Sequence, residues 1–417
     1  MRGVKTLVPL CLLLATDTMA ASQKITFEEL PRLIEERNQH VQAASLSRDA
    51  AKASTGHLTR SYLPTLQAGV GGERFASGLL GQKGQPKGGI EARLNLFRSG
   101  KDRLEEDYLE SQVTGKEAQR DQVYLDELTQ ARRSYWTIVY ERELIEFLQE
   151  AITQNDRNLA AALRRIKSGI ATDTDRIEFE MNGLQLKQDL ARARLGNRNS
   201  QRTLSVLLGL AEDTEFETEM AVPHLHDDKL VAETFEATSH RDVRSALADK
   251  QSLELQSSRA GRWWAPSLDL YAGYNLYTQQ ERDAPIVSDR WESSVGFKLT
   301  VPLFDGLSGM TERRAALLRA SAQENRAAQA GRQLKARWAA LKQELEVGHD
   351  LIHNVEAIVN QARQYLSRTQ GEYQRGVKNS VDMLNATSRY IETKRRAAEL
   401  KRDYLFSRSE ALATLGR

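Results

Sequence analysis

The stretch from Gly88 to Lys101 reads GGIEARLNLFRSGK and predicts an amphipathic strand that leads straight into a helix. Its apolar residues are Ile90, Ala92, Leu94 and Leu96, and the polar residues between them are Glu91, Arg93 and Asn95. A period of two is typical of a strand with one apolar face and one polar face. The charged, helix-favouring residues that follow continue to about residue 167, which is on the order of 100 Å of helix.

Three other segments alternate in the same way, so we expect strands at about 65–75, 89–97, 267–277 and 292–304. Strands of about 9–11 residues with this alternation suit a transmembrane β-barrel. The alternative is a soluble sheet with one face packed on helices, but the adjoining helices are too long and too polar to wrap a compact sheet. Aromatic residues near the strand ends suit interfacial belts: Tyr62, Trp263, Trp264, Tyr277 and Trp291.

Four strands cannot close a barrel, and an open edge in lipid leaves backbone groups without hydrogen bonds. Other copies of the chain must therefore complete the barrel, and a small cyclic homo-oligomer is the simplest solution.

The chain reads as two copies of one unit. Gly169 and Gly376 lie 207 residues apart, and so do Asp175 and Asp382. We expect repeats at 22–210 and 229–417, joined by a linker at 211–228 that is loop or irregular. Each repeat reads helix, strand, strand, long helix, turn, helix. The expected helices are 26–60, 99–167 and 173–208 in the first copy, and 229–262, 307–375 and 380–415 in the second.

The first 21 residues read as a signal peptide. A basic start with Arg2 and Lys5 precedes a short apolar run, Thr6–Ala15, and small residues suitable for cleavage. A core strand or a membrane anchor is the alternative, but the run is too short to span a bilayer. Cys11 is the only cysteine, so the mature chain is expected to hold no disulfide and no cysteine-ligated metal.

Other chemistry is weakly indicated. The net charge is +2, too balanced to suggest nucleic-acid binding. The segment HLHDD, His224–Asp228, could suggest a metal site, but a solvated linker fits better because no motif places further ligands. We find no nucleophile elbow, phosphate loop or metalloprotease motif and expect neither an enzyme nor a cofactor.

Together these features resemble the TolC-like outer-membrane efflux proteins over the whole mature chain. The most specific segment is Tyr373–Gly416, with Tyr-x-x-Gly, Val-Asp-x-Leu and a final Leu-Gly; ARRSYWTIVY (Ala131–Tyr140) and SYLPTL (Ser61–Leu66) add support. The resemblance implies a mainly α fold with a membrane β-barrel portion. Three protomers would give a 12-stranded barrel and a long α-helical coiled-coil tunnel.

The function it implies is a passive export duct of tripartite efflux or type I secretion. The duct would lie in the outer membrane of a Gram-negative bacterium and work with a periplasmic adaptor and an inner-membrane pump of ABC, RND or MFS type. A non-transporting coiled-coil envelope scaffold or adhesin is the alternative, and an enzyme is a distant third.

The resemblance also implies a gate at the helical turns. Gly169 and Gly376 suit the position after a helix, where φ is positive. The residues that match the gate of the family are Asp175, Tyr373, Lys378, Asp382 and Asn385. Lys378 stands where an arginine is often found, and Asn385 stands where a second aspartate can occur. The alternative is that these residues only form and cap the turns. In the barrel, Glu91, Arg93, Asp269 and Lys298 are expected to line the lumen.

Overall fold

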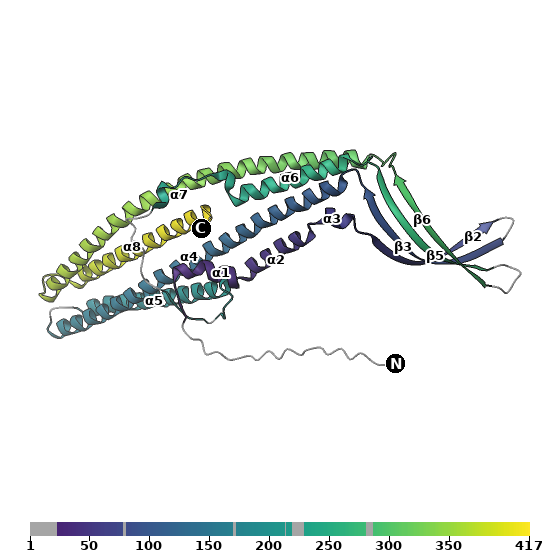
Figure 1. Ribbon diagram of the computed structural model, residues 1–417. Helices are drawn as coiled ribbons and strands as arrows, with labels where there is room; N and C mark the ends of the chain where they lie inside the picture. Colours follow the sequence, from purple (N-terminus) through teal and green to yellow (C-terminus); the bar gives the residue numbers. More distant parts are fainter. Residues whose placement is uncertain (1–22, 78–80, 170–171, 213, 219–228, 281–286) are drawn as a thin grey trace. The chain divides into compact units, whose positions relative to one another are not determined.

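The computed structural model describes residues 23–77, 81–169, 172–212, 214–218, 229–280 and 287–417 (Figure 1). The predicted signal peptide and the HLHDD segment lie outside these residues. The chain forms two compact units. The turn unit comprises Met1–Gln39, Leu125–Glu233 and Ala339–Arg417, and the sheet unit comprises His40–Tyr124 and Thr234–Trp338. Each unit therefore takes segments from both sequence repeats.

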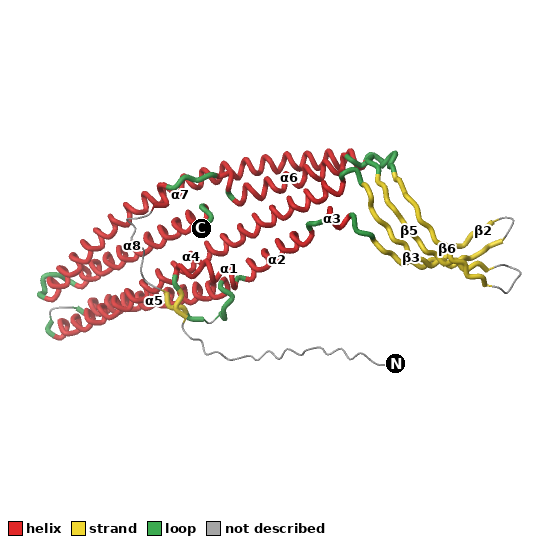
Figure 2. The backbone as a smooth tube through the Cα atoms, viewed as in Figure 1, coloured by secondary structure: helices red, strands yellow, loops and turns green. Residues whose placement is uncertain are grey.

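The sheet unit is built around one antiparallel sheet, drawn as yellow strands in Figure 2. Its strands, in spatial order, are β2 (Thr65–Ser77), β3 (Gly81–Phe97), β5 (Ser267–Gln280) and β6 (Val287–Thr300). β2 and β6 are thus the outer strands. The four predicted strands are present, but β3 begins eight residues earlier than expected and β6 ends at Thr300 rather than at residue 304.

The pairing register gathers the apolar residues on one face of the sheet. Leu94 lies opposite Leu270, and Leu270 lies opposite Phe297. This face is open in the single chain, because Val70 is 94% exposed, Val295 78% and Phe297 71%. A soluble sheet with one face packed on helices would bury these side chains. That alternative to a barrel therefore does not describe this sheet.

The end of β3 departs from simple alternation. A register shift separates Asn95 from Phe97, as in a β-bulge. Asn95 lies on the polar face, opposite Asp269 on β5, but it is not exposed as Glu91 and Arg93 are. Its side chain is buried and donates from Nδ2 to Asp102 Oδ2 at 2.9 Å. Asn95 therefore ties the strand to the first turn of the next helix.

The first helix of each repeat is broken, contrary to the continuous helices expected at 26–60 and 229–262. In the first copy, α1 (Leu30–Arg37), α2 (Gln39–Ser54) and α3 (His57–Ser61) follow a 3-10 turn, η1 (Phe27–Glu29). In the second, η3 (Lys229–Ala232) and η4 (Ala237–Ser239) precede α6 (Arg241–Gly261).

Side-chain contacts explain the two breaks in the first copy. At Asn38 the backbone is extended, and its side-chain amide donates to the carbonyl of Leu207 at 2.9 Å. At Gly56 φ is +82°, and the Glu106 carboxylate accepts from the amide of Gly56 at 2.7 Å. These partners are distant in the chain, so local helix propensity did not reveal them.

The remaining helices repeat with one spacing. α4 (Lys101–Lys167) and α7 (Ser308–Gln374) have 67 residues each, and α5 (Asp173–Leu207) and α8 (Ser380–Thr414) have 35 each. Both pairs begin and end 207 residues apart, the spacing that the sequence shows for Gly169 and Gly376. Among the described residues, no helix combines the length and hydropathy needed to cross a bilayer.

In the turn unit, α5 and α8 contact each other, and apolar clusters join them to the distal parts of α4 and α7. The linker expected to be irregular contains a short strand, β4 (Phe216–Thr218), which pairs in parallel with β1 (Gln23–Ile25).

Candidate functional site at the helical turns

The two turns that close the helix pairs have the backbone that the sequence predicts. Gly169 and Gly376 have φ of +72° and +82°. The Gly376 amide donates to the carbonyl of Tyr373 at 3.0 Å, and the Val377 amide donates to that of Glu372 at 3.0 Å. A residue with a Cβ would be strained at both glycines.

Polar side chains cap the helices that leave the turns. Thr172 forms a capping box with Asp175, whose Oδ2 accepts from the Thr172 amide at 2.9 Å. In the second copy, Asn379 Oδ1 accepts from the Asp382 amide at 2.8 Å. A cap of this kind is worth about 1 kcal/mol, so the turns are fixed by local bonds as well as by packing.

A shared apolar cluster lies beside the turns and includes one residue from each long and short helix of the turn unit. Its buried members are Ala162 on α4, Phe179 on α5, Tyr373 on α7 and Met383 on α8. The ring of Tyr373 packs edge-on to Phe179 with centroids 6.1 Å apart. The end of each helix pair is therefore held to the end of the other within one chain.

Tyr373 is also covered by a cation from the first repeat. The Arg165 guanidinium lies 4.5 Å from the centre of its ring, and Arg165 Nη1 donates to its carbonyl at 3.1 Å. Burial raises the pKa of Tyr373, against the lowering effect of Arg165. Its hydroxyl is buried without a hydrogen-bond partner among the described residues, so the ring rather than the hydroxyl makes the contact.

Asp175 reaches across to the second repeat through Ser380. The Ser380 hydroxyl contacts Asp175 Oδ1, and it lies 3.0 Å from Glu178 Oε2. Burial acts to raise the pKa of Asp175, but hydrogen bonds from Ser380 and Thr172, together with Arg165, hold it below its usual value. Asp175 thus stays ionised as it bridges α5 and α8.

The other predicted gate residues lie on the second turn and the start of α8. Lys378 Nζ is 3.7 Å from Asp382 Oδ2, with the two side chains 41% and 37% exposed. Asn385 is exposed one turn further along α8. The structure therefore brings Asp175 to Ser380, Tyr373 to Arg165, and Lys378 to Asp382.

Sequence reasoning missed Glu178 and Arg165, and it gave Ser380 only as a possible helix cap. Ser380 is the first residue of α8 and reads as a second capping candidate beside Asn379. Glu178 and Arg165 stand among many other charged residues on long helices. The contact of α5 with α8 distinguishes Ser380 and Glu178, and the contact of α4 with α7 distinguishes Arg165. A single sequence contains neither contact.

The predicted lumen residues lie together on the polar face of the sheet. Arg93 Nη2 pairs with Glu91 Oε1 at 2.8 Å, and both are half-exposed. Asp269 and Lys298 are direct cross-strand partners. In the described part of the chain, no group of three or more His, Cys, Asp or Glu side chains could hold a metal ion.

Comparison with known proteins identifies this architecture. The model of the outer membrane efflux protein family matches residues 30–210 and 236–416. No curated protein matches the chain.

Several solved structures share the fold at low sequence identity. CusC, which forms a transmembrane channel, aligns with a TM-score of 0.78 at 15% identity, over 98% of this chain and 96% of CusC. VceC of Vibrio cholerae gives 0.77 at 15%, over 94% and 96%. The open state of MtrE of Neisseria gonorrhoeae gives 0.72 at 17%, over 94% and 88%. The family match covers both repeats, and its members are passive channels rather than enzymes. The chain belongs to the outer membrane efflux protein family.

Proposed function

We propose that three copies of this chain form an outer-membrane export duct, and that the open sheet is the observation that carries the proposal. Its apolar face is uncovered, and its outer strands β2 and β6 need partners. In lipid, exposed apolar side chains are stable, whereas unpaired strand edges are not. Three copies would join β6 of one chain to β2 of the next and close 12 strands around a lumen.

The polar face of the sheet would line that lumen. The residues assigned to it are Glu91, Arg93, Asp269 and Lys298. They carry two charges of each sign, so the barrel would select weakly by charge. Selection would then depend on the machinery that loads the duct.

The helical turns would form the gate. Within one chain, Asp175 with Ser380 and Arg165 with Tyr373 hold the ends of the two helix pairs together. Three copies would bring three Asp382 side chains around one axis and give the constriction a negative potential. Lys378 pairs with Asp382 at 3.7 Å and would moderate this ring. Asn385 would add a neutral ring beside it.

The duct would act with two partners. We propose a periplasmic adaptor that contacts the turns and an inner-membrane pump that supplies the energy, in tripartite drug efflux or in type I protein secretion. The helical part would then extend into the periplasm of a Gram-negative cell. Pull-down of the tagged chain followed by mass spectrometry identifies the adaptor and thereby distinguishes the two pathways.

The direct test is reconstitution of the purified chain in planar lipid bilayers. A detergent-extracted trimer with single-channel currents is the expected result. A water-soluble oligomer that produces no current would contradict the duct and favour an envelope scaffold or adhesin.

A further inference from the structure

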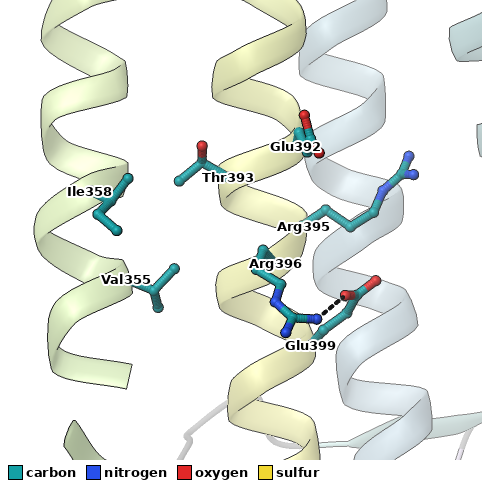
Figure 3. A pocket seen from close by; sticks show the side chains of 7 residues that line it. All are labelled: Val355, Ile358, Glu392, Thr393, Arg395, Arg396 and Glu399. Atoms are coloured by element: carbon teal, nitrogen blue, oxygen red, sulfur yellow. Dashed lines mark ion pairs between the residues drawn. The ribbon is translucent and has the colours of Figure 1, made fainter. Parts of the chain in front are cut away.

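The turn unit has a groove of about 650 Å³ between α7 and α8 (Figure 3). Val355 and Ile358 line it from α7, and the residues from α8 are Glu392, Thr393, Arg395, Arg396 and Glu399. Thr393 projects toward α7, and Arg396 pairs with Glu399 at 3.6 Å beside it. Ile358 is 51% exposed in the groove.

The internal repeat gives this groove a counterpart on α4 and α5. At a spacing of 207 residues, Val355 corresponds to Leu148, Ile358 to Ala151, Thr393 to Leu186 and Arg396 to Asp189. Leu148, Ala151 and Leu186 are buried members of one apolar cluster. The same positions are therefore covered in the first copy and form a groove in the second.

In the first copy, α8 of the same chain covers these apolar positions of α4 and α5. Ile391 packs against the cluster of Leu148, Ala151 and Leu186. One turn further along α8, Arg395 Nη2 lies 3.2 Å from Asp189 Oδ2. The repeat equivalents of these two covering residues are Leu184 and Gln188 on α5.

The face of α5 that would supply this cover is open in the single chain. Leu184 is 67% exposed, and Met181 and Leu195 on the same helix are 64% and 60% exposed. α5 already packs by its other face on α4 and α8. Leu184 on α5 and Ile358 in the groove are therefore both apolar side chains that the single chain leaves more than half exposed.

We infer that the groove between α7 and α8 receives Leu184 of a second copy of this chain. Leu184 of one chain would pack on α7 and α8 of the next chain in the way that Ile391 packs on α4 and α5 within one chain. This contact is heterologous, since the two surfaces differ, and three such contacts close a ring. The inference rests on the proposed trimer and names the surfaces that form its helical seam.

The seam between copies differs chemically from the seam within a chain. The ion pair of Arg395 with Asp189 would be replaced by Gln188 of one copy beside Arg396 of the next. Apolar burial of Leu184 would thus dominate the seam between copies, and salt would weaken it little.

Cysteine cross-linking tests the contact, with Cys11→Ala as the background so that no other thiol is present. One tagged chain carries Leu184→Cys, and a differently tagged chain carries Ile358→Cys. When the two are co-expressed and oxidised, a disulfide-linked dimer that contains both tags is expected. The register control pairs Leu184→Cys with Tyr365→Cys, which lies on the same face of α7 about 10 Å nearer the turn. A disulfide does not span that displacement, so this pair should give no dimer.

A second variant tests the energy of the contact. Leu184→Gln changes a side chain that is exposed in the single chain, so each chain should fold normally by circular dichroism. At a fixed detergent concentration, we expect the dissociation constant of the trimer to rise about tenfold, because apolar burial at each seam is lost.

The outcomes separate the two proposals. Conducting trimers that cross-link through Tyr365→Cys and not through Ile358→Cys, or that are unaffected by Leu184→Gln, overturn the seam and leave the duct standing. A monomeric, non-conducting chain overturns both. A mixed dimer through Ile358→Cys alone supports the seam.

Discussion

Replacing Ser380 with alanine should loosen the contact between the two helical turns. The Ser380 hydroxyl is shared by the carboxylates of Asp175 and Glu178 and is 2% exposed. A hydroxyl has one proton, so it donates to one carboxylate at a time. A hydrogen bond to a charged group is worth about 1.5–3 kcal/mol. Because Asp175 is only half-buried, we expect about 1.4 kcal/mol per chain, which is about tenfold in the local opening equilibrium.

Hydrogen exchange measured by mass spectrometry reports this opening. The amides at the start of α5 and α8 should exchange about tenfold faster in Ser380→Ala than in the parent protein, because local opening governs their exchange. Amides elsewhere in the turn unit should not change. In planar bilayers, the same variant should increase the fraction of time that the channel spends open at rest.

Asp173→Ala is the matched control. Asp173 lies in the first turn of α5, as Asp175 does, and carries the same negative charge as Asp175. Asp173, however, pairs with Arg176 of its own helix at 2.7 Å. Its loss removes a favourable charge at a helix start without touching α8. If Asp173→Ala accelerates exchange at α8 as much as Ser380→Ala does, or if Ser380→Ala accelerates it less than twofold, the bridge has no special role.

Three other predictions test the site, the sheet and the tunnel wall. Tyr373→Phe should preserve the denaturant midpoint, because the hydroxyl has no partner among the described residues, whereas Tyr373→Ala should cost about 3–5 kcal/mol. Phe297→Arg should reduce recovery in outer-membrane fractions by placing a charge on the apolar face, at about 2–4 kcal/mol near the bilayer centre, whereas Lys298→Gln should not. Burial raises the pKa of Glu141 above 4.5 despite Arg402, so its ionised form opposes folding. Glu141→Gln should therefore raise the denaturant midpoint at pH 7, and this gain should disappear as the pH falls below 4.5, where the parent side chain is protonated in both states.

The long elements were predictable because each is specified locally. The ends of α4, α5, α7 and α8 lie within two residues of the predicted bounds. Capping residues and positive-φ glycines mark them in the sequence. The breaks at Asn38 and Gly56 were missed because their cause is a contact with residues far along the chain.

The site was predictable only in part, for the same reason. The turns follow from Gly169 and Gly376, and Asp175 follows from the family resemblance. The partner of Asp175 depends on how α5 lies against α8, which repeat periodicity does not encode. The contact of Ser380 with Asp175 therefore emerges only from the structure.

The two repeats are not interchangeable, and their differences show how each helix chooses its partner. Glu141 on α4 faces Gly196 on α5, where a Cβ would lie 2.7 Å from its carboxylate. At the equivalent level of the second copy the sizes are exchanged, because Gly348 on α7 faces Tyr404 on α8, and a Cβ on Gly348 would lie 3.0 Å from its ring. At the 207-residue spacing Gly196 corresponds to Asp403, so pairing α4 with α8 in the manner of α5 would bring the Asp403 carboxylate against that of Glu141. Tyr404 corresponds to Asn197, so pairing α7 with α5 in the manner of α8 would set the smaller Asn197 side chain beside Gly348. Since like-charge contacts and underfilled positions both destabilise a core, these differences favour α4 with α5 and α7 with α8, even though the four helices come from two similar repeats.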